Sequence, residues 1–482
     1  MMSARDQQIE LRHSTFIAGD DRGVSMSSEP LIKQLANWVV GFDAAKIPAA
    51  VAMQAKLLLL DTLGCALAAQ DEEAFEAAFA TVKELGGAQR CTVIGTRDLT
   101  SIPHAVLLNG TLIRCLDLND IYVGPRQNGH PSDNIAVALS FGEAAGSTGA
   151  ELIAAIVLGY EIYGRFNDLA DPGSPWDHVT VSSVVAPAMA GRLLKLRADR
   201  LAHAMAISAA HGNTLSAVRF GQLSGAKNLA NAIVASNGAL ATLLAKHGLT
   251  GPSQILESPH GLAQAVFSGA DLSPLVRPVV EPYRIMDVSI KAYPCVGTAQ
   301  TAVAAAVQAR SAISYPLNDI RSISIRMADI PFVKRQLEDI ERRYPRTRET
   351  ADHSFYYLAA AGILDGDVSV DGFKKERWLD SDMKAMMERI TIAADDRLNV
   401  HVPGTYPCVL EITTRTGEKR TLEMIHAPGS VKNRMTQLQV ETKFRNGAAA
   451  RLSAAKQDEV IGQVMNLERL DSVAALMKSL QP

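Results

Sequence analysis

The densest group of side chains that could do acid–base chemistry lies in CLDLNDIYVGPRQNGHPSDN, residues 115–134. Its polar members are Asp117, Asn119, Asp120, Arg126, His130, Ser132 and Asp133. Pro131 ends the preceding conformation, and Ser132 or Asp133 can cap the helix that follows. His130 is therefore expected just outside a helix N-terminus, where an anion is favoured and a histidine can move a proton at neutral pH. The alternative is structural: the aspartates cap a helix end and His130 makes one ordinary hydrogen bond.

Two more positions are candidates for the same chemistry. His178 follows Asp177 in a Gly/Pro-rich loop before a helix, and a neighbouring carboxylate can orient an imidazole and raise its pKa. Adjacent side chains rarely point the same way, so a partly exposed loop histidine is the alternative. Lys227 directly precedes a long apolar helix, where the helix dipole repels a cation. Lys227 therefore needs an anionic partner, unless it is a solvated surface lysine.

Motifs of other enzyme classes are absent from the sequence. It has no GxGxxG after a strand, no Walker loop, and neither HExxH nor GxSxG in a usable context. No set of His, Asp and Glu has the short spacing of a dedicated transition-metal site. We therefore expect chemistry without a metal or a nucleotide cofactor.

The candidate residues are predicted to be positioned mainly by helices. From about residue 30 to 275, apolar residues recur at three- and four-residue spacing, as in the segments beginning at Met53, Ser132 and Gly149. The segment from Val181 carries Pro187 inside its pattern, which predicts a kink or a break. Several segments are apolar nearly all round, which is typical of helices in the middle of a large helical domain.

The pattern changes after about residue 278. The segment from Arg321 alternates with period two, and segments from Cys408 and Arg420 flank a turn around Gly417, which predicts a β-hairpin. Helical segments begin at Thr298 and Asp352. The expected fold is mostly α with an inserted α+β domain. Its parts are a loose polar tail (1–29), a helical domain formed by 30–278 and 428–482, and an α+β domain over 279–427.

Composition limits the function classes. The 482 residues are 47% hydrophobic and 21% charged, which excludes a disordered or fibrous chain. The formal net charge of -3 gives no field to attract nucleic acid or an anionic membrane, so neither is an expected partner. No apolar run reaches the roughly 18 residues of a spanning helix, and the first 30 residues carry charges where a signal peptide has its apolar core. Five widely spaced cysteines argue against a disulfide framework and favour the cytoplasm.

Several motifs, taken in order along the chain, resemble the MmgE/PrpD family. They are LDLND, GHPSDN, WDHV, the lysine at 227 before an Ala-rich helix, KAYPCVGTAQTAV from Lys291 and ADHSFYYLAAAGILDG from Ala351. The resemblance runs from about residue 30 to 470. It implies a large helical domain built from both chain ends, an α+β lid, an active site in the cleft between them, and a homodimer. The family includes 2-methylcitrate dehydratase, cis-aconitate decarboxylase and iminodisuccinate epimerase, so the resemblance also implies a small polycarboxylate substrate and no metal.

Carried over by position, the resemblance implies catalytic groups at Asp117, His130, His178 and Lys227, with Gln300 on the lid. In the decarboxylase branch a histidine stands at the position of Gln300, so this chain is more similar to the dehydratase branch. One departure is Ile121, where the family commonly has Thr; a hydroxyl contact to substrate is lost there.

Dehydration of a β-hydroxy polycarboxylate needs a base, an acid and fixed cations. His130 and His178 can serve as base and acid in either order, and Lys227 can hold a substrate carboxylate. Asp117 can orient a histidine or a loop, while Arg219 and Lys291 are weaker candidates for binding the other carboxylates. Decarboxylation and epimerisation reuse the same parts, so all three reactions stay open, and an inactive binding protein of the family is a further alternative.

Overall fold

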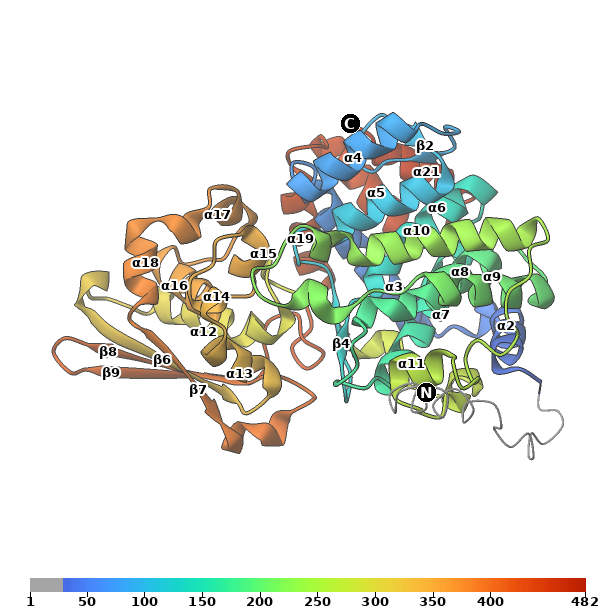
Figure 1. The fold of residues 1–482 in the computed structure, drawn as a ribbon. Coiled ribbons are helices and arrows are strands. Elements are labelled where there is room, and N and C mark those ends of the chain that lie inside the picture. The colour runs from blue at the N-terminus through green and yellow to red at the C-terminus, as the bar shows by residue number, and fades with distance from the viewer. Residues whose placement is uncertain (1–28) are drawn as a thin grey trace, which may run out of the picture. The chain divides into compact units, whose positions relative to one another are not determined.

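The computed structural model describes residues 29–482. The predicted polar tail, 1–29, lies outside the described residues except for its last position. Leu31–Pro482 group as a single unit, which is mostly α-helical with small sheets (Figure 1). The unit contains two large hydrophobic cores, one drawn from residues 32–290 and 440–480 and one from residues 295–412.

Helices make up most of the first 290 residues. They are α2 (Leu31–Gly41), α3 (Ala49–Ala68), α4 (Glu73–Leu85), α5 (Ile102–Arg114), α6 (Ile135–Ala145), α7 (Gly149–Asp168), α8 (Ser182–Leu193), α9 (Ala198–His211), α10 (Ala226–Lys246) and α11 (Leu262–Phe267). Short strands lie between them: β1 (Cys91–Thr92) pairs with β2 (Leu99–Thr100), and β3 (Ile121–Val123) lies between β4 (Asn128–Gly129) and β5 (Val288–Ser289).

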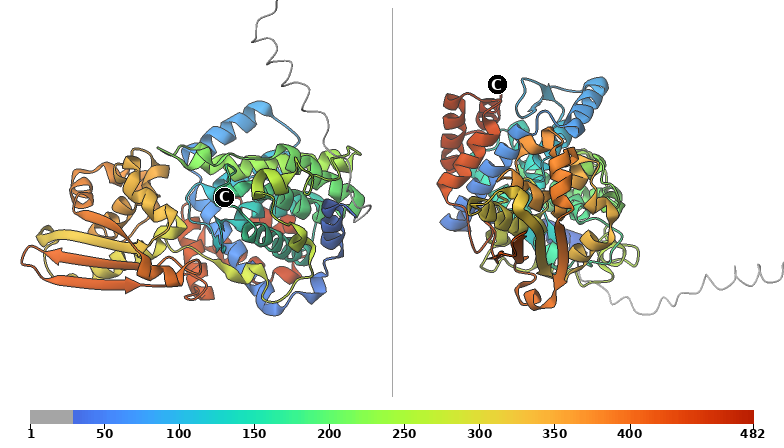
Figure 2. Two further views of the ribbon diagram at one scale, coloured as in Figure 1. Left: turned by 60° about the horizontal axis from the view of Figure 1, so that its bottom comes forward. Right: turned by 90° about the vertical axis from the view of Figure 1, so that its left-hand side faces the viewer.

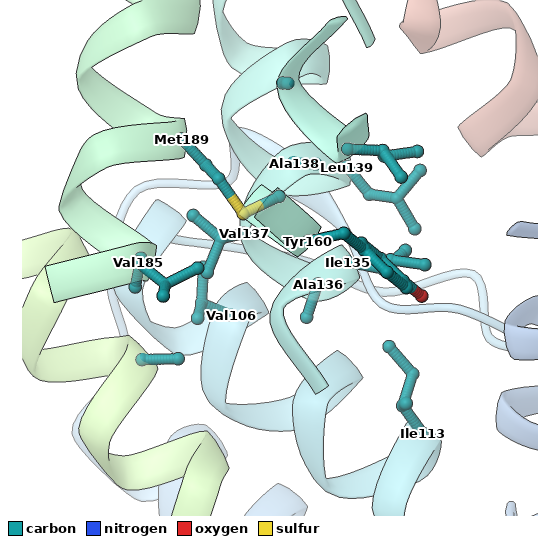
Figure 3. Packing of buried hydrophobic residues seen from close by; sticks show 14 of the residues in the cluster. Val106, Ile113, Ile135, Ala136, Val137, Ala138, Leu139, Tyr160, Val185 and Met189 are labelled. Carbon is teal, nitrogen blue, oxygen red and sulfur yellow. The ribbon is translucent and has the colours of Figure 1, made fainter. Parts of the chain in front are cut away.

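Small residues let these helices pack closely. Figure 3 shows Met189 of α8 directed into the cluster that contains Val137 of α6 and Tyr160 of α7. A Cβ atom at Gly159 would lie 2.4 Å from the Met189 sulfur, so only glycine at this position of α7 leaves room for the methionine. The interior is thus filled by interdigitated side chains, as protein cores generally are.

The C-terminal helices belong to the same core. These are α19 (Gln437–Ala448), α20 (Ala454–Met465) and α21 (Val473–Ser479), and their buried residues Val440, Phe444 and Leu476 share a cluster with Leu59 of α3. Figure 2 shows these red helices beside the blue, early part of the chain. A Cβ atom at Gly447 of α19 would lie 2.4 Å from the carbonyl oxygen of Gly64, so α19 and α3 cross with their backbones close together.

The second core belongs to a four-stranded sheet and its helices. The sheet has the order β7-β6-β8-β9, with β6 parallel to β7 and the other pairs antiparallel. Its strands are β6 (Ile320–Ala328), β7 (Ile390–Asp395), β8 (Cys408–Thr414) and β9 (Lys419–Met424). The helices are α12 (Gln300–Ser311), α13 (Pro331–Glu338), α14 (Ile340–Arg343), α15 (Arg348–Ala351), α16 (Phe355–Leu364), α17 (Val370–Lys374) and α18 (Ser381–Met387). Alternate residues of β6, among them Ile323, Ile325 and Met327, are buried against these helices.

Some sequence predictions are confirmed and others are wrong. The period-two segment is β6, and β8 and β9 form the predicted hairpin. The exact domain boundaries at 278 and 428 stay predictions. Of the kink or break predicted at Pro187, the break is wrong, because α8 runs through this residue; burial on all sides holds the helix together despite the missing N–H.

The statement that no apolar run is as long as a spanning helix is also wrong. By length and composition alone, α3 and α10 could cross a membrane. In the structure 78% and 61% of their apolar windows are buried inside the protein, so packing within the helical core accounts for their composition.

The α3–α19 crossing can be tested with two glycines. Gly447→Ala is expected to lower the free energy of unfolding by about 1–3 kcal/mol, because the new methyl group meets the Gly64 carbonyl oxygen. Gly462 of α20 is the control: a Cβ there meets nothing within 4 Å, so Gly462→Ala should raise stability by about 0.5–1 kcal/mol. Urea unfolding measures both changes, and equal effects would contradict the close crossing.

Candidate active site

Asp117 lies at the centre of a buried group of charges. It comes just after α5, and its φ of 48° is in the left-handed region that few non-glycine residues adopt. Its carboxylate contacts Nη1 of Arg114 at 2.8 Å, Nζ of Lys227 at 3.0 Å, and Nζ of Lys291. Burial alone would raise the pKa of Asp117, but Arg114, Lys227 and Lys291 hold it well below its usual value. Asp117 is therefore ionised, and its charge is shared by three cations.

Lys227 has the anionic partners that its place in the sequence predicts. It lies in the first turn of α10, its side chain is fully buried, and its Nζ is 3.0 Å from Asp117 and 3.4 Å from Asp352. Burial lowers the pKa of Lys227, while the two carboxylates act in the opposite direction. The alternative of a solvated surface lysine is wrong. The ammonium is bonded within the protein, so its role in holding a substrate carboxylate stays a prediction.

Asp352 and His353 contact the predicted site residues but were not predicted themselves. Nδ1 of His353 is hydrogen-bonded to Asp352, and its Nε2 lies 3.7 Å from Oδ2 of Asp117. Burial, reinforced by Lys227, lowers the pKa of His353 to about 4, so the imidazole is neutral at pH 7. The signal was present in the sequence: an acid–histidine pair stands directly before Ser354, which caps α16.

His130 is held by two hydrogen bonds, of which the one made by its ring defines its tautomer. Its backbone N–H donates to the Tyr163 hydroxyl at 3.1 Å, and its Nδ1 lies 2.6 Å from the carbonyl oxygen of Asp120. A carbonyl only accepts, so the ring proton is on Nδ1 and Nε2 carries the lone pair. Burial, with Arg114 and Lys291 acting in the same direction, lowers the pKa of His130 well below its usual value. The structure thus presents a neutral imidazole with one nitrogen able to accept a proton.

His178 also has an oxygen atom near its Nδ1, here that of a carboxylate and not of a carbonyl. Its Nδ1 lies 3.2 Å from Oδ1 of Asp177. Arg219 donates hydrogen bonds to that carboxylate from Nε at 2.7 Å and from Nη2 at 3.0 Å. Burial lowers the pKa of His178 to about 3 despite the carboxylate beside it. Its Nε2 is buried and has no hydrogen-bond partner among the described residues. The two adjacent side chains do meet, contrary to the expectation for neighbouring residues, and 11% of the His178 side chain stays exposed.

The fold brings the two predicted histidines together. Their ring centroids are 5.6 Å apart in an edge-to-face arrangement. His130 precedes a 3-10 turn (Pro131–Asn134) that leads into α6, and His178 begins one (His178–Val181) that leads into α8. The turns are linked, because Nδ2 of Asn134 donates to the Ser182 hydroxyl at 3.0 Å. Two loops far apart in the sequence therefore form one site.

A cluster of polar side chains holds the loop that carries His130. Asp120 accepts hydrogen bonds from the Ser132 hydroxyl at 2.6 Å and the Tyr160 hydroxyl at 2.7 Å, and Asn119 donates to Asp133 at 2.8 Å. Burial raises the pKa of Asp120 to about 7 and that of Asp133 to about 6. The prediction that Ser132 or Asp133 caps α6 is wrong: Asn134 is the N-cap and makes no side-chain cap bond. The two side chains instead bind the loop residues before them.

The three predicted substrate-binding residues also have protein partners. Arg219 binds Asp177, and Lys291 is fully buried against Asp117. The Gln300 amide accepts from the N–H groups of residues 292 and 293 and donates to the Tyr293 carbonyl at 2.9 Å, which holds the loop that follows Lys291. Direct contact of these residues with substrate stays a prediction, whereas their positioning contacts are observed.

Ile121 borders a cavity beside Lys291 and Gln300. The cavity is about 40 Å³ and is also lined by Thr301. A Cβ atom at Gly297 would lie 2.1 Å from Cδ1 of Ile121, so the glycine makes room for the larger side chain. The residue that departs from the family pattern therefore lies next to site residues and has a matching space.

Three carboxylate and imidazole ligands are close enough to hold a metal ion. Ligand atoms of Asp117, Asp352 and His353 lie within 4.8 Å of one another. The Lys227 ammonium already occupies this position, at 3.0 and 3.4 Å from the two carboxylates, and would repel a divalent ion. The donor set therefore fits an internal ammonium, and the prediction of a metal-free site remains open to test.

Comparison with known proteins decides the family. Residues 33–275 match the MmgE/PrpD N-terminal domain, and residues 293–468 match the MmgE/PrpD C-terminal domain. The chain belongs to the MmgE/PrpD family.

Members of the family with named activities are similar over much of the chain. Cis-aconitate decarboxylase of Homo sapiens is 25% identical over 94% of this chain and 94% of its own length. The 2-methylcitrate dehydratase of Salmonella typhimurium is 27% identical over 70% of this chain and 72% of its own length. The probable 2-methylcitrate dehydratase of Saccharomyces cerevisiae is 25% identical over 72% and 71%. These relatives are dehydratases and decarboxylases, which supports a lyase-type enzyme.

Removal of the buried ammonium should be costly. Lys227→Met is expected to lower the free energy of unfolding by about 3–5 kcal/mol, because Asp117 and Asp352 lose a partner where water cannot replace it. Lys83, whose pair with Asp98 is 55% and 36% exposed, is the control, and Lys83→Met should cost at most about 1 kcal/mol. Chemical unfolding of both variants provides the measurement. A Lys227→Met loss no larger than the control's would argue against the buried charge cluster.

The lowered pKa of His178 predicts how the stability of the protein depends on pH. At pH 5 an unfolded histidine is protonated, whereas His178, with a pKa of about 3, stays neutral in the folded protein. The unfolded state binds more protons, so stability is lost as the pH falls from about 6.5 toward 3. His178→Asn should make this loss shallower near pH 5 by about 1.4 kcal/mol per pH unit. Urea unfolding between pH 4.5 and 6 measures the slope; an unchanged slope would mean that His178 is not held neutral.

Proposed function

We propose that the protein is a metal-independent lyase that removes water from a small hydroxy-polycarboxylate similar to 2-methylcitrate. The observation that carries this proposal is the pair of neutral imidazoles, His130 and His178, with ring centroids 5.6 Å apart. Nδ1 of His130 is hydrogen-bonded to a carbonyl oxygen and Nδ1 of His178 lies 3.2 Å from a carboxylate oxygen, an arrangement that leaves Nε2 of each ring able to accept a proton. Such a pair supplies both proton-transfer groups that a dehydration needs.

The bond changes follow from this arrangement. Nε2 of one histidine takes the proton from the carbon next to a substrate carboxylate. The electrons of that C–H bond form the double bond as the C–O bond on the neighbouring carbon breaks. The other histidine gives its proton to the departing hydroxide, so the products are water and an alkene. A bound polycarboxylate raises the pKa of an imidazole beside it, so the second histidine can enter this step protonated.

The charge cluster suits an anionic substrate. Its cationic side chains are Arg114, Lys227 and Lys291, and its carboxylates are Asp117 and Asp352. These cationic groups lie in a buried environment, where they attract carboxylates and stabilise the enolate-like charge that develops in the reaction.

Decarboxylation of a cis-aconitate-like acid is the second candidate. Cis-aconitate decarboxylases match this chain over nearly its whole length, which favours it. The same histidines would protonate the carbanion left when carbon dioxide departs. Gln300 supports the dehydratase choice, since the family resemblance implies a histidine at this position in the decarboxylase branch. Epimerisation of an iminodisuccinate-like acid would also use the pair, whereas an inactive binding protein would not need two oriented neutral histidines.

Two further proposals concern the setting of the enzyme. We propose a homodimer, as the family resemblance implies, and a cytoplasmic location. The described cysteines, Cys65, Cys91, Cys115, Cys295 and Cys408, are all free and buried, which suits a reducing compartment.

A substrate panel tests the reaction. Chelator-treated protein is incubated separately with 2-methylcitrate, citrate, cis-aconitate and iminodisuccinate, and the products are followed by NMR. We expect an alkene and water from 2-methylcitrate or a close hydroxy acid. Carbon dioxide released from cis-aconitate, with no alkene from the hydroxy acids, would replace dehydration by decarboxylation.

Histidine variants test the assignment of the site. His130→Ala and His178→Ala should each lower turnover about 100-fold or more with little change in unfolding, because each removes a proton-transfer group. His203 of α9 is the control, since its Nδ1 accepts one hydrogen bond from the backbone N–H of Gly251 at 3.2 Å. Loss of turnover in a folded His203→Ala variant, with His130→Ala and His178→Ala active, would move the site elsewhere.

A further inference from the structure

The loop around Asp117 needs support from other parts of the chain. A left-handed backbone at a non-glycine residue costs free energy and persists only where its surroundings fix it. Part of the support is local, since the Asp117 N–H donates to the Arg114 carbonyl at 3.1 Å. Part comes from Lys291, whose Nζ donates to the Asp117 carbonyl at 2.6 Å as well as to its carboxylate. The Lys291 side chain must therefore itself be held in a fixed position.

A lysine on the C-terminal helix α19 connects both of these loops. Nζ of Lys443 donates to the backbone carbonyl of Leu118 at 3.0 Å and to that of Lys291 at 2.7 Å. It also lies 2.5 Å from Oδ1 of Asp61, a fully buried residue of α3. One ammonium thus donates hydrogen bonds to carbonyl oxygens on two segments and forms an ion pair with a carboxylate on a third.

These contacts connect Lys443, the Asp117 loop and the Lys291 loop to one another. Lys443 bonds the carbonyl of the residue after Asp117 and the carbonyl of Lys291, and the Lys291 side chain bonds Asp117. A shift of either loop breaks one of these bonds. We propose that Lys443 is a positioning residue that fixes the Asp117 loop against the Lys291 loop and so keeps the charge cluster in its productive geometry. This inference rests on the proposed lyase function only where turnover is measured.

The surroundings of Lys443 allow it to be replaced. Its side chain is 15% exposed and borders a cavity of about 380 Å³ that Leu118 and Ala292 also line. Methionine can take its place without overpacking, and arginine has room to extend into the cavity while donating to the same carbonyls. Variants at this position are therefore expected to fold.

Four variants separate the positioning role of Lys443 from its contribution to stability. Lys443→Met leaves Asp61 buried without its cation, so it should lower the unfolding midpoint and also reduce kcat about 10- to 100-fold, with a smaller change in KM. The double variant Asp61→Asn/Lys443→Met has neither charge and should regain the midpoint but not kcat. Asp61→Asn alone keeps both carbonyl bonds of Lys443 and should retain most of the turnover, and Lys443→Arg should restore part of it.

Hydrogen exchange gives a readout that needs no substrate. In Lys443→Met and in the double variant, backbone amides of residues 115–121 and 289–295 should exchange faster, while those of β6 and β8 stay as in the wild type. Unchanged exchange in the two loops, or recovery of kcat by the double variant to within twofold of wild type, would overturn the proposal. If the wild-type protein turns over none of the acids tested, faster loop exchange still supports the positioning role, and only the proposed reaction fails.

Discussion

The structure of the site depends on one buried carboxylate. Asp117 is bonded by Arg114 from the helix before it, by Lys227 from α10 and by Lys291 from the segment that links the two cores. An uncompensated carboxylate in this environment would be strongly destabilising, so each cation must be present and correctly placed. Lys227 extends the cluster to Asp352, which lies between the second core's α15 and α16. The requirement to neutralise one charge thus joins segments from most of the chain at a single point.

The chemistry available at the site follows from the same environment. Burial beside several cations favours the neutral form of an imidazole, which is why the pKa values of His130, His178 and His353 are all lowered. A neutral imidazole with its Nδ1 proton bonded to oxygen is oriented and has a basic Nε2, which is the form that a proton abstraction requires. The Lys227 ammonium, one of these cations, also occupies the position between Asp117 and Asp352 that a metal ion would need. Histidine protonation and charge compensation are therefore parts of one arrangement.

Local sequence patterns predicted the elements well and the long-range contacts poorly. Helical periodicity located the core helices, period-two alternation located β6, and the hairpin of β8 and β9 followed from its turn residues. The helix-dipole argument also required an anion at Lys227, because that argument uses only the first turn of α10. The identity of the anions could not be derived, since Asp117 and Asp352 lie 110 and 125 residues away in the chain. For the same reason Arg219 was predicted to meet substrate, when its nearest carboxylate belongs to Asp177.

The protonation state of the two site histidines is the most direct test of this account. Protein labelled with ¹⁵N in its histidine side chains can be studied by NMR from pH 5 to 8, with His130→Ala and His178→Ala used to assign the signals. We expect both residues to give the pattern of a neutral ring protonated at Nδ1, unchanged across this range. Signals that show an imidazolium at pH 6, or a proton on Nε2, would contradict the account.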